Sequence, residues 1–239
     1  MQELFGQLTL HDFHGDALRN IKSIRETQDL YDDLSADRQD WPAAIAAELA
    51  VKPPYSKPTI IERPFEETVY YNAIEYPFTS WIESRYSDGH FGVWYGADTL
   101  ETTVYETVYH WRRLLDAAEA FAQHDRPIVG ERRVFRVRSD AALLDFRARI
   151  ADFPSLVTPN DYRFAQEVGR RVHHEGHPGI VTQSAHCAGE VLAIFRKEVL
   201  SNPRNFCDLT YRLDTASGKV MVERQVGTTM MVIDNSFRA

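Results

Sequence analysis

The sequence predicts an α+β protein, in which helices lie mainly in the first part of the chain and strands cluster near its end. Two observations support this class. The last sixty residues hold short apolar runs separated by turn residues, and the longest amphipathic pattern precedes them. Strands and helices do not alternate as they do in parallel α/β folds. The runs that we expect to be late strands are 179–182, 191–195, 209–213, 220–225 and 230–233.

The N-terminal segment is expected to be helical over residues 1–52. Apolar residues recur there at helical spacing with charges between them; they are Leu18, Ile21, Ile24, Tyr31 and Leu34. A second helix is expected to start at Asp40-Trp41-Pro42, because Asp40 is a good N-cap and Pro42 suits a first turn. Three prolines between residues 53 and 58 then interrupt any helix. We therefore expect a helical extension, residues 1–55, and a main domain, residues 56–239.

The main domain begins with short aromatic runs. Thr68–Tyr71 and Gly92–Tyr95 are expected to be strands. Asp98–Gln123 has the clearest helical pattern, since Leu100, Val104, Val108, Trp111, Leu115 and Ala118 share one stripe. Val134–Arg138 alternates as a strand does, and Asn160–Glu175 is a further expected helix that ends before Gly176 and Pro178.

Composition limits the function classes. The 239 residues are 44% apolar and 26% charged, which is typical of a globular protein. A formal net charge of −8 argues against nonspecific binding to nucleic acid or to membranes. The first ten residues lack the pattern of a signal peptide, and no apolar run is long enough to span a bilayer. We therefore expect a cytoplasmic location.

Metal binding was considered and is not expected. The two cysteines, Cys187 and Cys207, do not form a CxxC pair. The cluster His173-His174-Glu175-Gly176-His177 is rich in metal-binding residue types. His173 and His177 would share a helix face only if the helix continued through Gly176, and Gly176 with Pro178 predicts that it ends there. A solvated helix end is the preferred interpretation.

The stretch from Ser84 to His110 carries the strongest functional signal. It contains Arg85 before a glycine turn, an aromatic run that ends in Tyr95, and then the long helix with Glu106 about two turns from its start. Glu106 points away from the apolar stripe of that helix, so it does not fill the core. The sequence lacks the glycine-rich dinucleotide-binding motif and the phosphate-binding loop, which excludes the commonest nucleotide enzymes.

Three ordered blocks resemble the RES domain, the toxin half of RES–Xre toxin–antitoxin pairs. They are Arg85-Tyr86-Ser87-Asp88-Gly89, then Val93–Ala97 followed by Thr102–Glu106, and finally Gly176–Ser184 with the apolar run 191–195. The N-terminal arginine of the family has no clean match, and Arg63 is the nearest candidate. The resemblance implies an ADP-ribosyltransferase-like fold, with a mixed or antiparallel sheet and flanking helices, and an enzyme that consumes NAD.

The resemblance also implies roles for individual residues. Glu106 would stabilise the positive charge that develops on the ribose when nicotinamide leaves, or bind the ribose hydroxyls. Arg85 would bind the pyrophosphate with its planar guanidinium. Tyr95 would stack on nicotinamide or ribose, with Tyr86 as a second aromatic contact. Ser184 would bind NAD or orient Arg85 or Glu106. Arg63, the nearest match to the N-terminal arginine of the family, is a further candidate for NAD binding.

Several alternatives stay open from sequence alone. The ADP-ribose acceptor is water, phosphate or a protein side chain, which would make the protein a glycohydrolase, a phosphorylase or an ADP-ribosyltransferase. A different class is an inactive module that only binds an antitoxin. NAD is expected as a substrate and no cofactor is expected. The implied partner is an Xre-type helix-turn-helix antitoxin, and self-association is also open. The N-terminal helices are expected to pack on the main domain.

Overall fold

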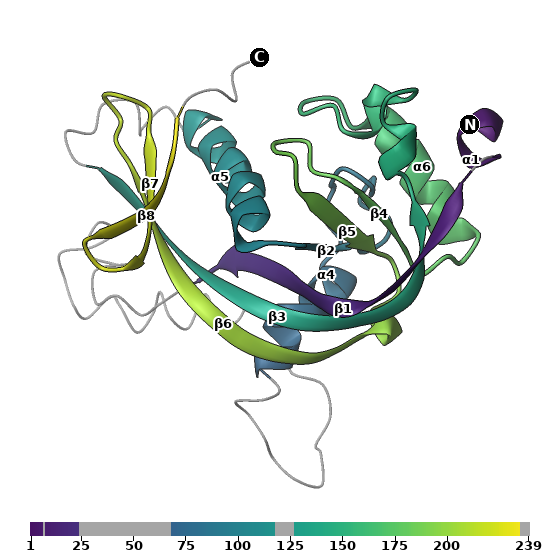
Figure 1. Cartoon of the computed structure of the whole chain (residues 1–239), viewed down its shortest axis with the longest axis horizontal. Helices are drawn as coiled ribbons and strands as arrows, with labels where there is room; N and C mark the ends of the chain where they lie inside the picture. The colour runs from purple at the N-terminus through teal and green to yellow at the C-terminus, as the bar shows by residue number, and fades with distance from the viewer. Residues whose placement is uncertain (7, 24–67, 118–126, 235–239) are drawn as a thin grey trace, which may run out of the picture.

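The computed structural model describes residues 1–6, 8–23, 68–117 and 127–234, and within them it confirms the α+β class (Figure 1). One eight-stranded sheet has the order β1-β2-β5-β4-β3-β6-β7-β8. All pairings are antiparallel except that of β3 with β4. The strands are β1 Thr9–Lys22, β2 Trp94–Ala97, β3 Ile128–Asp145, β4 Gly179–Gln183, β5 Glu190–Ile194, β6 Leu200–Leu213, β7 Val220–Gln225 and β8 Thr228–Ile233.

Helices flank this sheet. The α-helices of the described residues are α1 Gln2–Phe5, α4 Tyr76–Thr79, α5 Leu100–Ala117 and α6 Arg163–His174. A π-helix, η1 Tyr71–Glu75, precedes α4, and the single-turn 3-10 helices are η3 Arg147–Arg149, η4 Pro154–Leu156 and η5 Lys197–Val199. No helix within the described ranges has the length and apolar character needed to cross a membrane.

The sheet closes on itself in part. β1 pairs along its whole length with β3 and at Leu18↔Ala97 with β2, while β2, β5 and β4 continue back to β3. These five strands therefore form a closed ring, and β6, β7 and β8 extend from the other part of β3. In Figure 1 the long strands β1, β3 and β6 curve beneath α5, with α6 on the far side of β4 and β5.

The prediction of a helix over the N-terminal segment is wrong for residues 9–22, which form β1. The reason lies in how β1 is buried. Leu18 belongs to the core cluster beneath α5, whereas Ala17 and Ile21 pack in the cluster on the opposite face of the sheet. Only Ala17 and Leu18 of β1 are buried, and residues 9–16 are exposed or half-buried. The strand therefore offers no alternating apolar run, and the three-residue spacing of Leu18 and Ile21 imitates a helical stripe.

The other expectations have mixed outcomes. Thr68–Tyr71 is helical rather than extended, because it leads into η1 and α4. The long helix is confirmed as α5 up to Ala117, and the helix before Gly176 is confirmed as α6. The late strands are confirmed as β4 to β8. The expected helix at Asp40, the proline boundary at 53–58, the division at residue 55 and Arg63 lie outside the described residues.

Helix α6 packs so closely on the chain that a glycine is required at one position. A Cβ atom at Gly169 would lie 1.9 Å from the carbonyl oxygen of Tyr86, in the loop that follows residue 83. We expect Gly169→Ala to lower the free energy of unfolding by about 1–3 kcal/mol, since the backbone must move to admit the methyl group. Denaturant unfolding measures this, with the exposed Glu167→Ala as the control. Equal stability of the two variants would contradict the close packing.

Candidate functional site

A cavity of about 960 Å³ opens between the two long helices of the structure. Its walls come from β1, the loop before Tyr86, β2, one face of α5, the start of α6 and the connection from β4 to β5. These segments lie far apart in the sequence, and the ring of strands brings them together. Arg85, Tyr95 and Glu106 all line this one cavity, as the sequence predicts.

Glu106 is held by the turn between β4 and β5. The Ser184 hydroxyl donates to Oε1 of Glu106 at 2.6 Å, and the backbone N–H of His186 donates to the Ser184 oxygen at 3.0 Å. Burial raises the pKa of Glu106, while the Ser184 hydrogen bond and the positive charge of Arg85 oppose the rise. Ser184 therefore orients Glu106, one of the roles predicted for it, and leaves Oε2 free of this bond.

Arg85 reaches the cavity with an unusual set of contacts. Its Nη1 donates to the carbonyl oxygen of Thr158 at 2.6 Å, and its guanidinium lies 4.8 Å from the centre of the Tyr162 ring. Nη2 is buried and has no hydrogen-bond partner among the described residues. The guanidinium is thus fixed by a carbonyl and a ring, with one N–H group available to a ligand.

The two tyrosines of the predicted site differ. Tyr95 lines the cavity, and its hydroxyl bonds to Ser84 Oγ at 2.9 Å and accepts from the N–H of Tyr86 at 3.0 Å, so it anchors the Arg85 loop to β2. Tyr86 is fully buried, its hydroxyl donates to Leu156, and burial raises its pKa to about 12. Tyr86 packs in the core and also lines the cavity, and the predicted ligand contact stays a prediction.

The cavity contains a second, half-buried arginine that the sequence did not indicate. Arg19 on β1 donates from Nη1 to the carbonyl oxygen of Tyr95 at 3.1 Å and lies 5.6 Å from the Trp94 ring. Burial lowers its pKa to about 10, so it remains charged at neutral pH. Arg19 was missed because its segment was expected to be helical. It is the arginine that the N-terminal segment brings to the site, whereas Arg63 lies outside the described residues.

The cavity is lined by four arginines and three acidic residues. Within the described ranges, Arg19, Arg85 and Arg113 line it and make no ion pair with a carboxylate. Arg163 is instead paired with Asp161 at 2.6 Å. Unpaired guanidinium groups in a partly buried space are suited to a ligand with phosphate groups.

Two histidines that were not predicted from the sequence, His110 and His186, lie close to Glu106. His186 stacks on Tyr109 with the ring centres 3.8 Å apart, and its Nε2 lies 3.8 Å from Glu106 Oε2. His110 lies one helical turn after Glu106 on α5. Burial and the nearby arginine charges lower the pKa of His110 to about 4 and that of His186 to about 3. Both imidazoles are therefore neutral at pH 7.

Glu106, His110 and His186 place ligand atoms within 4.8 Å of one another, which is a candidate metal cluster. The arginine charges that lower the imidazole pKa values also oppose a divalent cation at this point. We therefore keep the expectation that the site works without a metal. In the 173–177 segment the side chains make separate contacts: His173 stacks on Phe91, and His177 lies 3.4 Å from Glu175.

Removing the Ser184 hydroxyl is expected to shift the acid limb of any activity that needs the Glu106 carboxylate. The hydrogen bond favours the charged form, so Ser184→Ala should raise the Glu106 pKa further and move the loss of kcat/KM to higher pH. The shift on Ser184→Ala identifies Glu106 as the group that titrates, because Ser184 bonds to this carboxylate. The pH dependence of kcat/KM measures the shift, with Ser217→Ala, on an exposed turn, as the control. An unchanged acid limb would show that Ser184 does not tune Glu106.

The RES domain family model matches residues 62–214, more than half of the chain. A search of the curated proteins found no match. Among solved structures, the MbcT–MbcA toxin–antitoxin complex of M. tuberculosis contains a similar chain, with a TM-score of 0.46 and 14% identity over 90% of this chain and 92% of that one. The matched region holds Arg85, Glu106 and Ser184, and the chain belongs to the RES domain family.

Proposed function

We propose that this protein is the toxin of a toxin–antitoxin pair and that it cleaves the nicotinamide–ribose bond of NAD. The observation that carries the proposal is the position of Glu106: a half-buried carboxylate, oriented by Ser184, faces a cavity that is also lined by arginines with no carboxylate partner among the described residues. This combination matches NAD, which presents a pyrophosphate to bind and a ribose that becomes positively charged as the bond breaks.

The arginines support the binding half of the proposal. The NAD pyrophosphate carries two negative charges, and bidentate guanidinium contacts are suited to it. Arg85 Nη2 and Arg19 Nε are both buried without a hydrogen-bond partner among the described residues. A buried donor without a partner is unfavourable, and a bound phosphate oxygen would satisfy each of them.

Glu106 supports the chemical half. The bond between ribose C1′ and the nicotinamide nitrogen breaks, and its electron pair leaves with nicotinamide, which becomes neutral. The C1′–O4′ unit then carries positive charge, which the Glu106 carboxylate stabilises at close range in a partly buried site. The acceptor oxygen bonds to C1′ and releases its proton. No strong general acid is required, because the leaving group is already cationic.

The acceptor defines the activity more closely. We favour degradation of free NAD, with water or inorganic phosphate as the acceptor. Water gives ADP-ribose and phosphate gives ADP-ribose 1″-phosphate. Transfer to a protein side chain is the alternative, and it would leave a protein with added ADP-ribose mass.

The experiment incubates the purified protein with NAD and follows free nicotinamide by chromatography. Reactions with and without phosphate, and with and without cell lysate, are compared by mass spectrometry of the ADP-ribose product. Release of nicotinamide supports the proposal, and the product mass identifies the acceptor. No release under any of these conditions would contradict enzymatic activity and favour the binding-module alternative.

We also propose that an Xre-type helix-turn-helix antitoxin is the partner, acting in the cytoplasm. The net charge of −8 suits a partner that carries a basic DNA-binding domain. Co-expression with a neighbouring gene that encodes such a protein should restore growth to cells that express this chain. Equal toxicity with and without that protein would contradict the partnership.

A further inference from the structure

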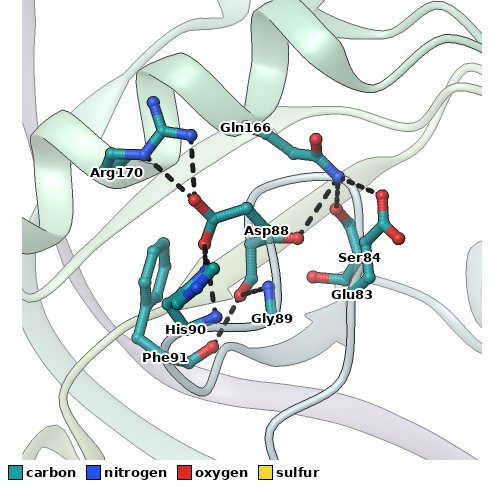
Figure 2. Close-up of polar contacts among 9 residues, drawn as sticks. Glu83, Ser84, Asp88, Gly89, His90, Phe91, Gln166 and Arg170 are labelled. Atoms are coloured by element: carbon teal, nitrogen blue, oxygen red, sulfur yellow. Dashed lines mark hydrogen bonds and ion pairs between the residues drawn. The ribbon is translucent and has the colours of Figure 1, made fainter.

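We infer that Gln166, on α6, is a positioning residue that holds the Arg85 loop in its ligand-binding conformation. The inference rests on the proposed function, because it concerns how Arg85 is presented to NAD. Arg85 lies on an irregular loop, and such a loop places a side chain reliably only if its backbone is fixed. Figure 2 shows the contacts that fix it.

The Gln166 amide is directed at the backbone on both sides of Arg85. Its Nε2 lies 3.2 Å from the carbonyl oxygen of Ser84 and 3.3 Å from that of Ser87, and it donates to Glu83 Oε1 at 2.9 Å. Three oxygen atoms around one nitrogen identify this end of the side chain as the NH2 group. Ser84 and Ser87 also bond to each other through their backbones, at 2.8 and 3.3 Å, and the Gln166 amide ties this bridge to α6.

A second contact from the same helix face holds the next turn of the loop. Arg170, one helical turn after Gln166, donates from Nε and Nη2 to Asp88 Oδ2 at 3.0 and 2.8 Å. The other oxygen of Asp88 accepts from the N–H of His90 at 3.2 Å. Figure 2 shows Gln166 and Arg170 projecting from α6 onto this loop. The Arg170 pair is exposed, whereas Gln166 also lines the cavity, so Gln166 is the more direct positioning group.

The inner face of the loop is fixed by other groups. The N–H of Tyr86 donates to the Tyr95 hydroxyl, and the Arg85 guanidinium is held by Thr158 and the Tyr162 ring. Tyr162 directly precedes α6, so the helix and the segment before it contact both the backbone and the side chain of this motif. Gln166 adds to these contacts of the Arg85 loop by donating to the Ser84 and Ser87 carbonyl oxygens.

The test uses Gln166→Glu, which preserves size and replaces the NH2 donor with an oxygen that faces three others. We expect the Kd for ADP-ribose and the KM for NAD to rise about tenfold, as the loss of one to two hydrogen bonds implies. kcat should change less than KM, because Glu106 is held by another turn. Gln225→Glu, at an exposed position on β7, is the matched control for the added charge.

A double-mutant cycle with Arg85→Ala separates positioning from general destabilisation. If Gln166 acts through Arg85, then Gln166→Glu should change the Kd for ADP-ribose less than about twofold in the Arg85→Ala background. Equal effects in both backgrounds, or no effect in either, would overturn the inference. Failure of the wild-type protein to bind ADP-ribose or release nicotinamide would instead be a failure of the proposed function. In that case amide hydrogen exchange over residues 84–91 decides: faster exchange in Gln166→Glu than in Gln225→Glu supports the positioning role, and equal exchange overturns it.

Discussion

Glu106→Gln is expected to lower nicotinamide release by about a thousandfold while leaving the protein folded. The substitution preserves the size of the side chain and lets the amide oxygen accept the Ser184 hydrogen bond. It removes the negative charge that faces the ribose, and loss of one electrostatic contact to a charged transition state in a buried site costs roughly 10²–10³ in rate. The effect should appear in kcat, since the charge on the ribose develops only as the bond breaks.

The control for this variant is Glu101→Gln, an exposed position in the first turn of the same helix. Steady-state kinetics on NAD and thermal unfolding should be measured for both proteins. We expect Glu101→Gln to retain the wild-type rate and Glu106→Gln to unfold at or above the wild-type temperature, because a buried carboxylate has been replaced by a neutral group. Full activity in Glu106→Gln would remove this residue from the chemistry.

The sequence predicted the C-terminal sheet better than the N-terminal strand, for a physical reason. β4, β5, β7 and β8 are runs of five or six residues bounded by turns such as the one at Gly227, so their ends are marked locally. The fourteen-residue β6 was predicted only over residues 209–213. β1 instead takes its structure from pairing with β3 along its full length, more than a hundred residues away. Such a partner leaves no local signal, and since only Ala17 and Leu18 of β1 are buried, no run of alternating apolar residues marks the strand.

Site residues that lie in recognisable short sequence motifs were predicted, and those that only the fold brings to the site were not. The apolar stripe of its helix indicated only that Glu106 does not fill the core, and its functional role came from the family resemblance; in the structure Glu106 lines the cavity. Arg85 and Ser184 were likewise recognised through the family resemblance; the structure places Arg85 on the cavity wall and Ser184 in a hydrogen bond to Glu106. Arg19 and His186 could not be identified from the sequence, because only the closure of the sheet brings β1 and the turn after β4 together at the cavity.

Arg85→Ala is expected to weaken binding of ADP-ribose, and to raise the KM for NAD, by about a hundredfold. Truncating one partner of a buried charged hydrogen bond costs roughly 2–5 kcal/mol, and 1.4 kcal/mol corresponds to tenfold. Arg85→Lys should recover little affinity, because an ammonium group does not provide the planar pair of donors or stack on Tyr162 in the same way. Arg224→Ala, on β7, is the control, and calorimetry with ADP-ribose is the measurement. Binding within twofold of wild type in Arg85→Ala would exclude Arg85 as a phosphate ligand.

Arg85→Ala and Arg85→Lys also show whether the effect of Arg85 on the Glu106 pKa comes from its charge or from its guanidinium geometry. The positive charge of Arg85 lowers the Glu106 pKa against the effect of burial. Without that charge the pKa rises further, so Arg85→Ala should lose kcat/KM at a higher pH than the wild type as the solution is acidified. Arg85→Lys keeps a positive charge nearby and should retain most of the wild-type acid limb despite its weak binding. If both variants shift the limb equally, the position of the guanidinium rather than its charge controls Glu106. If neither shifts it, Arg85 acts on the ligand alone.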